Sequence, residues 1–89
     1  MKELDQNDLR YVLSLSRTGR IAAAARKLGV DGSTFSRRIA RIESRLGVRL
    51  FQRNAGVLTP TEPGKVVVRK AESIELEFNA VTDSATSAR

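Results

Sequence analysis

The 89-residue sequence contains no cysteine and no histidine. Their absence excludes disulfides, zinc sites of the Cys/His type, thiol catalysis and every Ser–His or Cys–His catalytic arrangement. The sequence also has no apolar run near the roughly 20 residues that a membrane span needs, and its start is not typical of a signal peptide. We therefore expect no enzyme, no metal and no cofactor, but a binding module of a reducing compartment, the cytoplasm.

Acidic side chains are scarce in the middle of the chain. Overall, 16 lysines and arginines against 10 aspartates and glutamates give a net charge of +6. Residues 17–53 hold ten of those bases and only two acids, whereas residues 1–16 and 54–89 each have a net charge of −1. A solvated helix surface usually mixes both signs, so this concentration predicts a polyanionic partner. Nine of the ten central bases are arginines, whose forked guanidinium suits phosphates and guanine edges.

The composition, 40% hydrophobic and 29% charged, is typical of one globular domain, and the residue patterns indicate that it is mainly helical. A first helix begins near Asn7 or Asp5, either of which can cap it, and ends at Gly19. A short helix rich in alanine follows over residues 21–28.

The third helix, from about residue 33 to residue 46, is capped by Asp31 or Ser33 and has two distinct faces. Its core stripe consists of Phe35, Ile39, Ile42 and Leu46. An adjoining arc holds Thr34, Arg37, Arg38, Arg41 and Arg45. Two helices joined by a glycine-containing turn, the second with an exposed basic face, predict a helix-turn-helix whose third helix enters a DNA major groove.

Two short β-like runs, residues 48–51 and 57–58, flank a turn-rich loop over residues 52–56. They predict a small β-hairpin, a wing beside the third helix, which must lean on the helices because two strands alone are marginally stable. Neighbouring residues point to opposite faces of a strand, so we expect either Leu50 or Phe51 to seal the core.

A long last helix begins near Thr61, which can cap it, with Thr59 and Glu62 as an alternative capping box. Its apolar residues follow a seven-residue repeat: Val67, Ala71, Ile74, Phe78, Val81 and Ala85. A helix of about 25 residues is roughly 37 Å long, more than so small a domain can cover, so we expect it to pair with the same helix of a second copy. The alternative, in which the stripe folds back on its own domain, fits residues 66–71 better than residues 78–88.

Five stretches carry a resemblance to a known family: residues 24–28 (AARKL), 36–39 (SRRI), 42–43 (IE), 46–53 (LGVRLFQR) and 61–64 (TEPG). Over about residues 7–85 the chain resembles the N-terminal domain of LysR-type transcriptional regulators. The resemblance implies a winged helix-turn-helix that binds double-stranded DNA. It also implies a homodimer in which the linker helices pair antiparallel, so that the two copies read an inverted-repeat operator.

Family members usually continue into an effector-sensing domain and assemble as tetramers. We therefore expect a fragment of a longer bacterial protein, with a winged helix-turn-helix domain over residues 1–60 and a linker and dimerisation helix over residues 61–89. At three places the chain departs from the family. Asp31-Gly32-Ser33 stands where Ser-Gln-Pro or Ser-Gln-Ser is common, Arg20-Ile21-Ala22 replaces Ser-Phe-Thr, and the wing carries Ala55-Gly56 where an arginine is common. Because Gly32 cannot read a base as a glutamine does, we expect an operator unlike the family's usual sites.

The candidate DNA contacts are Ser33, Thr34, Ser36, Arg37, Arg38, Arg41, Arg53 and Arg20. Arg37 or Arg38, in the first two turns of the third helix, can grip a guanine edge, while Arg41 and Arg20 are expected at phosphates. Arg53 either meets DNA or forms a salt bridge with Glu43, which we interpret as structural. The alternative to DNA contact is that these residues form an ordinary helix N-terminus, with side-chain caps and arginines that face only solvent.

Two other functions are alternatives to sequence-specific DNA binding. The same fold can dock an acidic protein partner, but such an interface needs aromatic anchors, and outside the expected core only Tyr11 is a candidate. A non-specific DNA coat needs cations on several surfaces, unlike the clustered charge found here.

Overall fold

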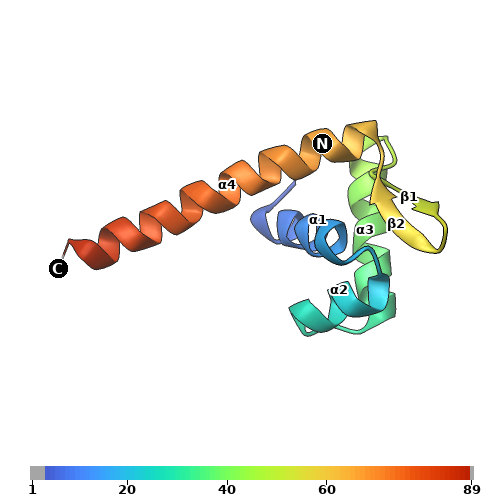
Figure 1. Cartoon of the computed structure of the whole chain (residues 1–89), viewed down its shortest axis with the longest axis horizontal. Helices are drawn as coiled ribbons and strands as arrows, with labels where there is room; N and C mark the ends of the chain where they lie inside the picture. Colours follow the sequence, from blue (N-terminus) through green and yellow to red (C-terminus); the bar gives the residue numbers. More distant parts are fainter. Residues whose placement is uncertain (1–3, 89) are drawn as a thin grey trace.

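Three short helices open the chain in the computed structural model, which describes residues 4–88: α1 (Gln6–Thr18), α2 (Ile21–Leu28) and α3 (Gly32–Leu46). A two-stranded antiparallel hairpin, β1 (Phe51–Asn54) and β2 (Val57–Pro60), precedes the long helix α4 (Glu62–Ser87). Figure 1 shows the hairpin at the right-hand edge and α4 extending far to the left. The arrangement is the mainly helical winged helix-turn-helix that the sequence predicts.

Side-chain caps mark where three of the described helices, α1, α3 and α4, begin. Asp5 caps α1 in a reciprocal box with Asp8, in which Asp5 Oδ1 accepts from the N–H of Asp8 at 2.7 Å. Asp31 caps α3, and Thr61 caps α4 by accepting from the N–H of Gly64 at 3.1 Å. Of the alternatives open in the sequence, these contacts select Asp5, Asp31 and Thr61.

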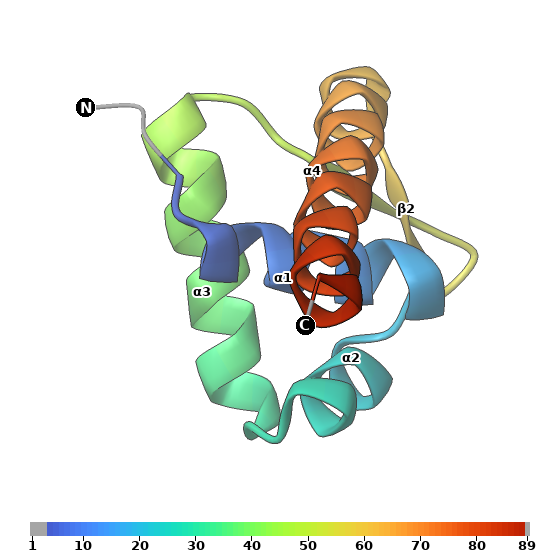
Figure 2. The ribbon, with the colours of Figure 1, turned by 90° about the vertical axis from the view of Figure 1, so that its left-hand side faces the viewer.

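The core lies where α1, α2 and α3 meet. Its buried side chains include Val12, Leu15, Ala24, Ala25, Phe35, Ile39 and Ile42. The expected stripe of α3 is confirmed, although its last member, Leu46, is only partly buried. Figure 2, which looks nearly along α4, shows α3 toward the start of α1 and the hairpin toward its end, with α4 in front of α1.

The hairpin begins later than expected, at Phe51, and its strands are joined by the two residues Ala55 and Gly56, both with positive φ (54° and 81°). Such a two-residue turn matches the twist of an antiparallel pair. Leu50 and Phe51 are both buried, at 0% and 2% exposure, so the expectation that only one of them seals the core is wrong. Leu50 precedes β1, and strand alternation therefore does not apply to it.

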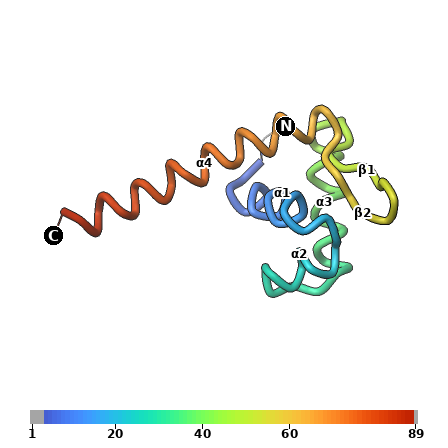
Figure 3. The backbone as a smooth tube through the Cα atoms, in the orientation of Figure 1, coloured from blue at the N-terminus to red at the C-terminus, as the bar shows by residue number. Residues whose placement is uncertain are grey.

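α4 starts against the base of the wing and then leaves the domain. A β-carbon on Gly64 would overlap the carbonyl oxygen of Leu50, so only glycine permits this approach. Ala71 is the last buried residue of α4, and Figure 3 shows the rest of the helix continuing unbroken away from the other elements. None of the helices in residues 4–88 combines the length and apolar character that crossing a bilayer requires.

Candidate nucleic-acid interface

The outward side of α3 carries polar and cationic side chains. Because Phe35, Ile39 and Ile42 turn inward, all the residues between them except Arg38 face solvent. Ser33, Ser36, Arg37 and Arg41 are exposed and Thr34 is partly buried. The helix-turn-helix therefore presents these predicted site residues together, on one side of the first three turns of α3.

A small hydrogen-bond network organises the start of α3. Asp31 Oδ1 accepts from the N–H of Thr34 at 2.7 Å and from the hydroxyl of Ser33 at 3.0 Å. Hydrogen bonds from the backbone and side chain of Thr34 and from Ser33, together with the charge of Arg37, lower the pKa of Asp31. The network therefore keeps the exposed Asp31 carboxylate charged at the start of α3. The Ser33 hydroxyl donates its hydrogen bond to Asp31, so its proton is already engaged within the protein.

Arg38, counted among the candidate DNA contacts predicted from the sequence, does not face outward with its neighbours but packs against α1. Its Nε lies 2.6 Å from Oδ1 of Asp8, a carboxylate that is 1% exposed, and its guanidinium lies 5.0 Å from the ring centre of Tyr11. Tyr11 is itself buried, with its ring centre 4.9 Å from that of Phe35, so it is no surface anchor for a protein partner.

Asp8 was not predicted as a site residue, although the sequence carries a signal for it. Asp8, Val12 and Leu15 follow the spacing of one helix face, which places a carboxylate on the buried side of α1. Burial alone raises the pKa of Asp8, but hydrogen bonds from Arg38 and from the N–H of Asp5, with the charges of Arg38 and Arg41, outweigh burial and lower the pKa. Asp8 is therefore a buried anion with defined partners.

Glu43 fastens the wing to α3. Its Oε2 accepts from the N–H of Leu50 at 2.8 Å and from that of Phe51 at 3.3 Å, and Oε1 lies 3.7 Å from Nε of Arg49. Glu43 is thus structural as expected, but its ionic partner is Arg49 rather than Arg53. Arg53 lies exposed on β1 opposite Leu58.

A crevice of about 200 Å³ separates α3 from the wing, and Ser36 and Arg53 are among the residues that line it. Arg20 is exposed at the cap of α2. It follows Gly19, whose carbonyl accepts a 2.8 Å hydrogen bond from the N–H of Leu58 in the wing. The backbone thus places Arg20 next to the wing, on the border of the helix-turn-helix.

The apolar stripe of α4 divides at its middle. Two residues that the sequence places in the dimer seam pack on their own domain instead of facing solvent: Ala71 is 1% exposed and Val67 is partly buried against the core. Ile74, Phe78 and Val81 are 46%, 53% and 66% exposed, and Ala85 is exposed too.

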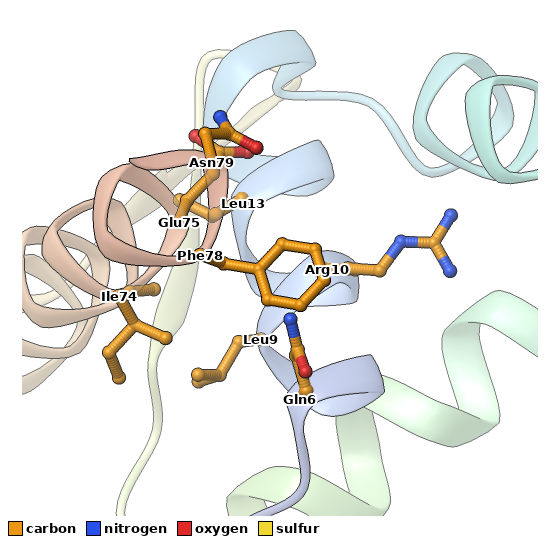
Figure 4. A pocket seen from close by; sticks show the side chains of 9 residues that line it. Gln6, Leu9, Arg10, Leu13, Ile74, Glu75, Phe78 and Asn79 are labelled. Atoms are coloured by element: carbon orange, nitrogen blue, oxygen red, sulfur yellow. The ribbon is translucent and has the colours of Figure 1, made fainter. Parts of the chain in front are cut away.

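Beside the exposed part of the stripe, a groove of about 220 Å³ lies between α1 and α4. Figure 4 shows Phe78 and Ile74 facing Leu9 across it. Among residues 4–88, no cluster of three or more acidic, cysteine or histidine side chains is arranged to hold a metal ion.

Comparison with known proteins gives consistent matches. The family model for the bacterial regulatory helix-turn-helix protein, lysR family, matches residues 6–65. The Mau operon transcriptional activator of Paracoccus denitrificans is 35% identical over 79 residues, which are 89% of this chain and 28% of that protein. The chain spans about a quarter of the length of the curated relatives it matches.

Solved structures resemble nearly the whole chain. VV2_1132, a LysR family transcriptional regulator, superposes with a TM-score of 0.83 at 34% identity, over 98% of this chain and 30% of that one. The CbnR_DBD chain from a crystal structure of the CbnR_DBD–DNA complex superposes with a TM-score of 0.80 at 29% identity, over 97% of this chain and 100% of that one.

Proposed function

Because the chain belongs to the lysR family of bacterial regulatory helix-turn-helix proteins, we propose that it binds double-stranded DNA in a sequence-specific manner, as the DNA-binding part of a transcriptional regulator. The main support for the proposal is the outward side of α3, where exposed hydroxyl and guanidinium groups lie together in the first turns of the helix. The DNA complex of CbnR_DBD, a chain of the same fold, supports it.

The first turns of α3 enter the major groove, which is about 12 Å wide and admits a helix. Arg37 grips a guanine edge with its two donors, which contributes about 1–3 kcal/mol of discrimination. Ser36 and Thr34 contact bases or phosphates through their hydroxyls, and Ser33, whose proton is held by Asp31, offers an acceptor. Arg41, further along the helix, meets phosphate.

Two cations extend the contact beyond α3. Arg53 on the wing reaches the DNA backbone or the minor groove across the crevice it shares with Ser36. Arg20, beside the wing, contacts phosphate at the edge of the helix-turn-helix. Both side chains are exposed, and charge is concentrated in this part of the chain, which favours a polyanion.

Two copies bind together. The exposed apolar side chains Ile74, Phe78, Val81 and Ala85 of α4 pair with those of a second copy, which relates two α3 helices by a two-fold axis and matches an inverted-repeat operator. Residues 1–60 then read the DNA and residues 61–89 join the copies. Tetramers of a longer protein would combine two such dimers, acting in the bacterial cytoplasm where the DNA is.

Selection of bound sites from a random duplex pool, followed by titration at several salt concentrations, tests the function. We expect one palindromic sequence to be enriched, and log affinity to fall steeply with log salt concentration. Equal affinity for all duplexes would instead support a non-specific DNA coat. If the chain binds no duplex even at low salt, the proposed function is wrong and the alternative is docking of an acidic protein. For that alternative the buried Tyr11 supplies no surface anchor.

A further inference from the structure

The pair formed by Asp8 and Arg38 joins α1 to the recognition helix α3 through two charged groups that are largely removed from water. The two atoms in contact, Asp8 Oδ1 and Arg38 Nε, are 2.6 Å apart, and the Asp8 side chain is 1% exposed. Asp8 Oδ2 also accepts from the N–H of Asp5 at 3.0 Å. If either partner were removed, the other would be left as a largely buried charge without its ionic partner, which is unfavourable. The pair therefore keeps both side chains in place.

Three groups, two from α1 and one from its N-cap residue, surround the Arg38 guanidinium. Besides Asp8, the carboxylate of Asp5 lies 3.6 Å from one of its terminal nitrogens, and the face of Tyr11 lies 5.0 Å from its central carbon. The Arg38 side chain is 21% exposed, whereas Arg37 and Arg41 on the same helix are exposed. At about 100° per residue, Arg38 stands some 60° round the helix from Arg41, so a released Arg38 side chain reaches the DNA side of α3.

We propose that Asp8 is a specificity-determining positioning residue: by pairing with Arg38, it keeps this arginine off the DNA backbone. The inference rests on the proposed function, since it concerns how the same interface discriminates among duplexes. Phosphate contacts carry no sequence information and supply most of the affinity for random DNA. On random-sequence DNA, a released Arg38 side chain contacts a phosphate wherever the chain sits along the duplex. On the operator, the base contacts fix the position of the chain, so the affinity added by Arg38 is smaller. Asp8 therefore raises the ratio of operator to random affinity.

The first test compares Asp8→Asn with Asp83→Asn, which removes an acid from the exposed end of α4 and so makes the same change in net charge. Each variant of the 89-residue chain is titrated with a labelled random-sequence duplex and with the operator selected from a pool, at several salt concentrations. For Asp8→Asn we expect tighter binding to random duplex, a lower operator-to-random ratio, and a log–log salt slope steeper by about 0.9, the value for one phosphate contact. Asp83→Asn should keep the natural slope. Equal changes in both variants, or an unchanged slope in folded Asp8→Asn, would overturn the inference.

The second test uses the double variant Asp8→Asn/Arg38→Gln, which has the natural net charge and replaces the ion pair with two neutral amide groups. The double variant keeps the inference testable if Asp8→Asn alone does not fold. Thermal melting followed by circular dichroism establishes that the double variant is folded. We expect the double variant to have the slope of the natural chain, because in both proteins Arg38 supplies no charge to the DNA. A slope shallower by about 0.9 would mean that Arg38 contacts phosphate in the natural chain, and the inference would be wrong.

The two proposals fail in different ways. If the natural chain binds no duplex even at low salt, the proposed function is wrong and the role of Asp8 in specificity falls with it. If the natural chain selects an operator but the double variant loses one phosphate contact, the proposed function stands and only the role of Asp8 is rejected.

Discussion

Arg17 at the end of α1 binds Glu75 of α4 at two points, through hydrogen bonds of 2.7 and 3.3 Å between the guanidinium nitrogens and the two carboxylate oxygens. This pair lies 58 residues apart in the sequence and beyond Ala71, the last buried residue of α4. It therefore attaches the projecting part of α4 to α1 just beyond the last buried residue of that helix.

Replacing Glu75 with Gln should weaken this attachment with little loss of stability. Both side chains are more than 40% exposed, so water and salt screen the pair, and we expect the free energy of unfolding to fall by no more than about 1 kcal/mol. Urea denaturation measures the change, with Glu77→Gln as the matched control on the same helix. A loss of several kcal/mol would mean that the pair is more than a surface contact.

Gly64→Ala should be severely destabilising. Its β-carbon would overlap the Leu50 carbonyl, a backbone atom that cannot move aside as a flexible side chain does, so we expect a loss of about 2–4 kcal/mol or failure to fold. Gly32→Ala is the control, since a β-carbon there meets only a side-chain atom of Ile21 at 3.8 Å within a helix, where alanine is favoured. Thermal melts that show equal stability for both variants would contradict the close approach of α4 to Leu50.

Arg37→Ala and Arg41→Ala should affect DNA binding differently. Loss of a bidentate base contact relaxes preference at one operator position, by about 1–3 kcal/mol. Loss of a phosphate contact weakens binding to all sequences alike and makes the salt slope shallower by about 0.9. Selection from random duplexes, with salt titration of each variant, separates the two effects. The reverse pattern would mean that α3 is rotated in the groove relative to our proposal.

Substitution of Ile74 and Phe78 by Asp should convert dimers to monomers, because it places charge in the proposed apolar seam. Sedimentation equilibrium measures the change. Leu76→Asp is the control: Leu76 is 70% exposed, and at 100° per residue it lies about 200° round the helix from Ile74, on the opposite side. Dimers that persist in the double variant, or that are lost in the control, would contradict the seam.

Acid should destabilise the fold, partly through Asp8. Its folded-state pKa is lowered, so the ionised carboxylate contributes stability that is complete above the ordinary carboxyl pKa and is lost as the pH falls through about 4 and below. Asp31, Glu62 and Glu75 have lowered pKa values and act in the same direction. Urea denaturation between neutral pH and pH of about 3 should show a steeper fall in unfolding free energy for the natural chain than for Asp8→Asn. Parallel curves would mean that Asp8 is not ionised in the folded chain.

Much of the fold could be predicted from local signals. Helix caps such as Asp31 and Thr61 act on N–H groups only three residues away, and the spacing of Phe35, Ile39 and Ile42 is a property of one helix. The β-like runs at residues 48–51 and 57–58 predicted the wing, and the family resemblance added an antiparallel arrangement of the paired last helices. Leu50 was harder to place, because its burial depends on Glu43 of α3 and on the start of α4 rather than on strand alternation.

The interface was predictable as a region but not residue by residue. Alternation of apolar and cationic positions along residues 33–46, a one-dimensional property, determined by itself that this chain has a basic recognition helix. The tertiary structure decided which arginines that helix presents, because Asp8, 30 residues away, holds Arg38 against α1. It also decided where the stripe of α4 passes from the core of its own domain at Ala71 to solvent at Ile74. Helical period follows from local backbone geometry, whereas the partner of a charge and the covering of an apolar side chain depend on which distant segments pack beside them.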